Sequence, residues 1–165
     1  FEEAVRLGEY AESLREVILT MKHGHAEGLA ERVGELWATR REAQLRALDF
    51  DLVVPIPLHW WRRWRRGYNQ SEALSRQLAL RLVCEHRPHW LRRIRATRSQ
   101  MLLSPTARRT NLSGAFRVSR FAQFQGRKVM LVDDVLTTGS TLNEAAKVIK
   151  KAGAVRVVAA VLAHR

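Results

Sequence analysis

Cysteine is nearly absent from this 165-residue chain, which contains Cys84 alone. A single cysteine excludes a disulfide within the chain and a zinc site of the CxxC type. It is also typical of a reducing compartment, and a cytoplasmic location is therefore expected.

Long apolar runs are also missing, so no transmembrane helix and no membrane insertion are expected. The chain does not open with a signal peptide. It begins with Phe1 and two acids rather than Met, and we interpret it as a fragment whose true N-terminus is missing.

Acidic residues are scarce: 16 against 29 Lys and Arg, which gives a net charge of +13. No acid lies between Glu85 and Asp133, a segment rich in arginine. Such an excess usually indicates an anionic partner, which here means a phosphorylated substrate, nucleic acid or an acidic membrane. Solubility or compositional bias is the alternative, and the clustering of the arginines favours an anion-binding face.

The most informative stretch present is 129–141. Val129 to Val132 is an unbroken apolar run, typical of a strand buried on both faces of a parallel sheet. Asp133 and Asp134 are expected to end it. A helix with apolar residues at helical spacing follows and is expected to stop at Gly153.

Between strand and helix lies a polar loop, whose members are Thr137, Thr138, Gly139, Ser140 and Thr141. The free N–H groups and partial positive charge of a helix N-terminus there suit a phosphate monoester. Asp133 and Asp134 would repel a phosphate, but they can accept hydrogen bonds from hydroxyls or lie near Mg²⁺. A phosphate beside a diol describes a sugar phosphate, and an ordinary strand–helix turn is the alternative interpretation.

This stretch resembles the phosphoribosyl pyrophosphate (PRPP) motif of type I phosphoribosyltransferases. The resemblance implies that Asp133 and Asp134 hold the ribose 2- and 3-hydroxyls as the catalytic acids. It also implies that Thr137 to Thr141 hold the 5-phosphate.

A second strand is predicted at 51–57, where Pro55 and Pro57 end its pairing. It leads into a stretch of three tryptophans and four arginines (60–66), expected as a loop, and then a helix capped by Asn69 or Ser71. Three interpretations stay open for the Trp/Arg stretch: pyrophosphate binding, single-stranded nucleic-acid binding, or a partly buried aromatic cluster with a solvated arginine face.

Two N-terminal helices are expected, from Ala11 and over about 26–48, after an opening strand. Strands are predicted at 88–94, 115–118 and 154–163. Ser104 and Pro105 indicate the start of a short helix carrying Arg108 and Arg109, in a segment suited to closing over an anion. We divide the chain into an N-terminal helical segment, 1–50, packed on a core at 51–165, the two forming a single compact domain.

Together the segments resemble the ComF family of phosphoribosyltransferase-like proteins, known for competence and DNA uptake. Three blocks carry the likeness: Val54 to Leu58 with Arg66-Gly67-Tyr68-Asn69-Gln70; a second block; and the PRPP motif. The members of the second block are Arg95, Thr97, Gln100, Arg108, Arg109, Asn111, Gly114 and Phe116. Tyr10, Leu14 and Lys22 also match the family's opening. The zinc ribbon with which family members often begin is absent from this chain.

The resemblance implies an α/β fold of the type I phosphoribosyltransferase kind, with a mainly parallel twisted sheet flanked by helices and the PRPP loop at the C-terminal end of a central strand. It implies a phosphoribosyl transferase that binds PRPP with Mg²⁺ held through the ligand, with Asp133 and Asp134 as the candidate protein contacts. The candidates for pyrophosphate are Pro57, Leu58, Arg66, Arg95, Arg108 and Arg109. The alternative is a module of the DNA uptake machinery that senses PRPP or holds single-stranded DNA without turnover. A homodimer is among the assemblies considered.

Overall fold

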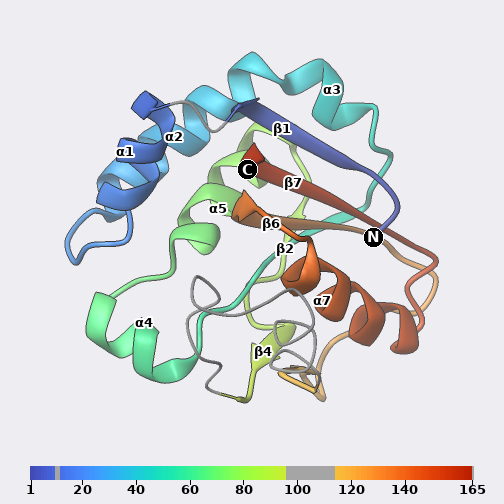
Figure 1. The fold of residues 1–165 in the computed structure, drawn as a ribbon. Coiled ribbons are helices and arrows are strands. Elements are labelled where there is room, and N and C mark those ends of the chain that lie inside the picture. The colour runs from blue at the N-terminus through green and yellow to red at the C-terminus, as the bar shows by residue number, and fades with distance from the viewer. Residues whose placement is uncertain (10–11, 96–113, 165) are drawn as a thin grey trace.

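The computed structural model describes residues 1–9, 12–95 and 114–164. Its centre is a five-stranded sheet of order β1-β7-β6-β2-β3 in which every pairing is parallel (Figure 1). The strands are β1 (Ala4–Glu9), β2 (Leu52–Pro55), β3 (Glu85–His86), β6 (Lys128–Leu136) and β7 (Arg156–His164). β6 lies in the middle, as the sequence predicts.

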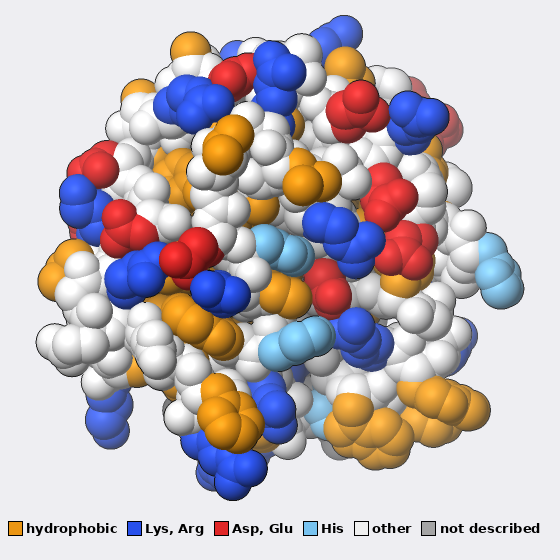
Figure 2. All heavy atoms as spheres, turned by 180° about the vertical axis from the view of Figure 1, so that it is seen from behind, with side chains coloured by type: hydrophobic (Ala, Val, Ile, Leu, Met, Phe, Trp, Pro, Cys, Tyr) orange, Lys and Arg blue, Asp and Glu red, His pale blue; other side chains and the backbone are white. Residues whose placement is uncertain are grey.

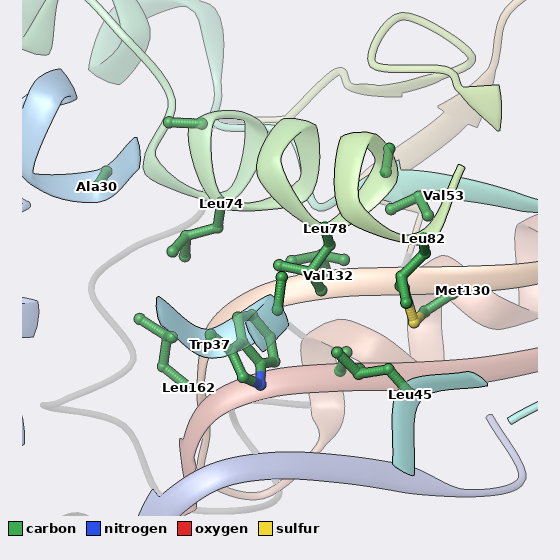
Figure 3. Close-up of a cluster of buried hydrophobic side chains, with 14 of the residues drawn as sticks. Ala30, Trp37, Leu45, Val53, Leu74, Leu78, Leu82, Met130, Val132 and Leu162 are labelled. Carbon is green, nitrogen blue, oxygen red and sulfur yellow. The ribbon is translucent and has the colours of Figure 1, made fainter. Parts of the chain in front are cut away.

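Helices cover both faces of this sheet, which explains why the central strands are apolar throughout. One face packs against α1 (Glu12–Thr20), α2 (Glu27–Arg40), α3 (Glu42–Arg46) and α5 (Gln70–Leu82). Figure 3 shows Trp37, Leu74 and Leu78 of two of these helices meeting Met130 and Val132 of β6. The molecule is therefore an α/β protein with a parallel sheet, as expected.

The other face packs against α7 (Ser140–Lys151) and a small antiparallel pair, β4 (Leu91–Arg93) with β5 (Phe116–Val118). Val129 and Leu131 face this side, so successive residues of β6 alternate between the two cores.

The chain changes direction between β2 and β6. From β2 it continues outward to β3, whereas from β6 it continues the opposite way to β7. The carboxyl ends of β2 and β6 therefore flank a topological switch point, where open α/β sheets bind their ligands.

Several predicted boundaries are wrong. The strand expected at 51–57 is β2, Leu52–Pro55, in which Pro55 still pairs with Val132. Asp133 and Asp134 do not end their strand: β6 continues to Leu136, because β7 is long enough to pair with it through Val135↔Ala163 and Leu136↔His164. The expected helix over 26–48 is broken at Arg41, whose guanidinium Nη2 donates to the Leu7 carbonyl at 2.8 Å.

The Trp/Arg stretch is not a loop but a helix, α4 (Trp60–Arg66). It ends where Gly67 adopts φ = +83°, a left-handed conformation that favours glycine. The helix predicted to carry Arg108 and Arg109 lies outside the described residues.

Segment 1–50 joins the rest of the chain closely. β1 pairs with β7, and α2 packs along α5. Among the described residues, no helix is both long enough and apolar enough to span a bilayer.

Candidate functional site

The two predicted acids lie at the carboxyl end of β6, beside the switch point. Two helices start nearby: α5 follows β2 through α4, and α7 follows β6 through the 137–139 loop. Side chains from α5 and from the turn after α1 reach the acids.

Asp134 is buried, with 7% of its surface exposed, and three donors hold its carboxylate. Gln70 Nε2 donates to Oδ2 at 3.1 Å, Lys22 Nζ lies 3.2 Å from the same oxygen, and the Val135 N–H donates to Oδ1 at 2.8 Å. A buried carboxyl group requires such partners, so the Asp134 side chain is held in one orientation.

Asp133 is half-buried and has weaker support. Ser71 Oγ donates to its Oδ1 at 3.1 Å, and the Asp134 N–H donates to the same atom at 2.9 Å. Burial and the neighbouring charge of Asp134 raise the pKa of Asp133 to about 7, although these two hydrogen bonds and Lys22 oppose the shift. The pair thus combines one firmly oriented carboxyl group, Asp134, with a second, Asp133, whose pKa is raised to about 7.

The 137–141 loop lies at the start of α7. Thr137 and Thr138 are exposed, and the Thr138 and Ser140 hydroxyls are hydrogen-bonded at 2.8 Å. Gly139 has φ = +69°, and the first turn of α7 contains no acid. A helix start without acids keeps its positive end available to an anion.

The Arg66–Gln70 block forms the turn between α4 and α5. Asn69 caps α5 by accepting from the Ser71 N–H at 3.2 Å, and its Nδ2 donates to the Ile56 carbonyl at 3.1 Å. The Tyr68 hydroxyl donates to the Met21 carbonyl, which fixes the turn next to Lys22. These bonds hold Gln70 and Ser71 within hydrogen-bonding distance of Asp134 and Asp133, respectively.

The residues predicted to contact pyrophosphate differ in how far they are exposed to solvent. Arg66 is half-buried and donates through Nη1 to Gln70 Oε1. Burial lowers its pKa, and the charge of Asp134 opposes that shift. Pro57 and Leu58 are half-buried at the end of β2, and Arg95 is exposed. Arg108 and Arg109 lie outside the described residues.

Four residues that interact with Asp133 or Asp134 were not predicted as site residues: Lys22, Gln70, Ser71 and Arg93. The charge of Asp133 acts on Arg93 of β4, whose pKa is lowered mainly by burial, and the Arg93 guanidinium lies 5.5 Å from the centre of the Phe116 ring. Lys22 and Gln70 belong to the motifs quoted for the family resemblance, which was the available signal. Nothing in the local pattern around Arg93 indicates its role.

A metal ion would find few protein ligands here. Within the described ranges, no group of three or more His, Cys, Asp or Glu side chains could hold one. Two adjacent carboxylates suit Mg²⁺ that takes its remaining ligands from substrate oxygens and water. This arrangement fits an ion that arrives with a phosphorylated ligand.

Comparison with known sequences assigns residues 65–165 to the Phosphoribosyl transferase domain family. "Competence protein F" of Haemophilus influenzae is 36% identical over 157 residues, covering 93% of this chain and 69% of that protein. "DNA utilization protein YhgH" of Escherichia coli K12 is 36% identical over 158 residues, covering 93% of this chain and 68% of the relative.

Solved structures agree on the fold. Adenine phosphoribosyltransferase from Saccharomyces cerevisiae superposes with a TM-score of 0.53 at 16% identity, covering 84% of this chain and 69% of that one. Glutamine PRPP amidotransferase from B. subtilis gives 0.52 at 20% identity over 80% of this chain, but only 25% of its own much longer chain.

Proposed function

This chain belongs to the ComF family of phosphoribosyl transferase domain proteins, and on that premise we propose that it binds PRPP with Mg²⁺ and transfers the phosphoribosyl group. The observation that carries the proposal is the carboxylate pair Asp133–Asp134 held next to the acid-free start of α7.

Asp133 and Asp134 accept hydrogen bonds from the ribose 2- and 3-hydroxyls. Asp134 is already oriented by Gln70 and Lys22, so it needs no reorganisation when the ligand arrives. Asp133 accepts best as an anion, and binding therefore strengthens as the pH rises through its pKa of about 7.

The loop Thr137 to Thr141 holds the 5-phosphate with its hydroxyls and with backbone N–H groups at the start of α7. The pyrophosphate lies towards Pro57, Leu58 and Arg66, where guanidinium groups neutralise its charge, and Mg²⁺ bound with the ligand would add to that neutralisation. Arg95 is a further candidate for the pyrophosphate, as are Arg108 and Arg109, which lie outside the described residues.

In the reaction, the bond from ribose C1 to the pyrophosphate oxygen breaks and a bond from C1 to a nitrogen nucleophile forms. The electron pair of the broken bond leaves with the pyrophosphate, and the nitrogen releases a proton to solvent. Positive charge builds on the ribose in the transition state, next to the carboxylate pair.

Calorimetric titration of the protein with PRPP, in the presence and absence of Mg²⁺, tests the binding step. Asp133→Asn and Asp134→Asn should each weaken binding at least tenfold, whereas Asp49→Asn, an exposed acid paired with Lys128, should leave it unchanged. Ribose 5-phosphate should compete. No binding by the unaltered protein, or equal binding by the two site variants, would refute the assignment.

Turnover needs its own measurement. Pyrophosphate release from PRPP, followed with a panel of amines and nucleobases, should appear with one acceptor class and disappear in Asp134→Asn. Binding without release from any acceptor would favour the alternative, a module that senses PRPP without chemistry.

The names of the relatives refer to competence and DNA utilization. On that basis we place the activity in the cytoplasmic handling of incoming DNA. Loss of transformation in a host strain carrying Asp134→Asn, at unchanged protein level, would support this placement, and normal transformation would oppose it.

A further inference from the structure

Helix α4 exposes all three of its tryptophans to solvent. Trp60, Trp61 and Trp64 have exposed fractions of 67%, 51% and 73%, whereas Trp37 in the core is fully buried. At about 100° per residue, the three positions fall within about 100° of the helix circumference, so they form one face. No residue of α4 is buried, and that face points away from the protein.

The rings make a continuous aromatic surface. Trp61 and Trp64 are stacked with centroids 5.2 Å apart at 26°, and Trp60 meets Trp61 edge-on at 5.9 Å. His59 packs against Trp60 with the ring centres 5.5 Å apart but is itself buried, so the exposed aromatic surface consists of the three tryptophans. Figure 2 shows protruding hydrophobic groups at its lower right edge, the side on which α4 lies when Figure 1 is turned around. Outer ring faces of this kind can stack on flat, unpaired bases.

Arginines flank the aromatic face on both sides. Arg65 is exposed, Arg63 pairs with Glu72 at 2.7 Å, and α4 contains no acid. Arg62 lies on the opposite side of α4 from the rings, where its charge adds to the burial that lowers the pKa of Arg93. A polyanion that carries aromatic groups fits this combination of rings and charges.

We propose that α4 is a docking surface for single-stranded nucleic acid, with Trp60, Trp61 and Trp64 stacking on bases and the exposed Arg65 beside them contacting phosphates. Duplex is the poorer ligand, because its bases are stacked on one another and hidden from the rings. A lipid surface also fits α4 less well than single-stranded nucleic acid does. The helix is only about 10 Å long and contains no aliphatic residue, whereas interfacial helices bury a longer apolar stripe.

The test is fluorescence anisotropy of a labelled 20-nucleotide oligo-dT titrated with the whole chain. The variant Trp60→Ala/Trp61→Ala/Trp64→Ala should lower affinity at least tenfold, since stacking on one base alone is worth about that factor. Phe121→Ala is the matched control, because Phe121 is also 67% exposed and has the Arg120 guanidinium 4.6 Å from its ring centre. The control should bind like the unaltered protein, and a circular-dichroism melt should show that both variants are folded.

Affinity for oligo-dT that is unchanged in the triple variant would overturn the proposal. A 20-base-pair duplex or inorganic polyphosphate of equal charge that competes as well as oligo-dT would also overturn it, since charge alone would then explain binding. The proposal would also be overturned if the triple variant lost its binding to vesicles containing phosphatidylglycerol but kept its binding to oligo-dT. Asp133→Asn should bind oligo-dT normally, which separates this surface from the sugar-phosphate site.

Discussion

Two neighbouring regions on either side of Gly67 use polar and aromatic side chains in opposite ways. After Gly67, Tyr68, Asn69 and Gln70 are buried, and each makes a hydrogen bond to another element. Before Gly67, α4 has no buried residue and exposes its rings to solvent. The residues after Gly67 fix the geometry of the carboxylate site, whereas α4 presents a surface on which another molecule can dock.

Stability should separate the two regions most clearly. Asn69→Ala removes the cap of α5 and the hydrogen bond to the Ile56 carbonyl, and we expect a loss of about 2–3 kcal/mol in the free energy of unfolding. Trp64→Ala should change it by less than about 0.5 kcal/mol. Urea denaturation measures both, and an equal loss would mean that α4 is packed against the protein.

A smaller effect should appear in the pH dependence of Asp133. Its native pKa of about 7 lies above an unfolded value of about 3.9, so the native state binds more protons between these values and loses stability as the pH rises through that window. Asp133→Asn keeps the Oδ1 acceptor and removes the charge. We expect the variant to be more stable than the unaltered protein by about 1–2 kcal/mol at pH 8 and by much less at pH 5.

Thermal unfolding at both pH values checks this expectation, and only the difference between the two proteins is informative because other groups also titrate. The same gap at pH 5 and pH 8 would contradict a raised pKa. Arg65→Gln on the α4 side should show no such pH-dependent gap.

The junction itself can be tested at Gly67. Alanine there keeps φ = +83° only with strain, and no atom lies within 4 Å of the added Cβ, so the cost of about 1 kcal/mol is a backbone effect. Gly28→Ala in α2 also meets nothing within 4 Å but has ordinary helical geometry, and it should be neutral or stabilising. Melting temperatures that move the same way in both variants would show that the turn does not depend on the left-handed conformation.

A small effect on stability is also expected from Lys22→Met. Its ion pair with Asp134 is partly exposed and should contribute less than about 1 kcal/mol. Its charge lowers the pKa of Asp133, however, so the variant should shift the pH midpoint of ribose 5-phosphate binding upward. Calorimetry from pH 6 to 9 measures the midpoint. Lys147→Met, which breaks an exposed ion pair with Glu144 on α7, should leave the midpoint unchanged.

Local pattern was enough to predict the central strand, α7 and the loop between them, because Val129 to Val132 is apolar and apolar residues recur at helical spacing after the polar loop. It failed where the answer depends on a neighbour. β6 continues past two charges because β7 pairs with it, and nothing near Asp134 in the chain indicates that Lys22 reaches it.

The helical state of α4 was missed for a related reason. Amphipathic helices are recognised by an apolar face turned towards the core, but here the large apolar side chains are turned outward and the inner side carries Arg66. A pattern method has no reason to expect a helix whose apolar face has no partner in its own chain.

The hydrogen-bonded series from Arg66 through Gln70 to Asp134 joins the last residue of α4 to the carboxylate pair. A ligand on α4 that draws Arg66 away from Gln70 would free the Gln70 side chain and loosen Asp134. Thermodynamic linkage then requires reciprocity: whatever factor an oligonucleotide applies to sugar-phosphate affinity, the sugar phosphate applies to oligonucleotide affinity. Arg66 and Gln70 at the turn, together with Asp134 on β6, would in that case couple the occupancy of α4 to that of the sugar-phosphate site.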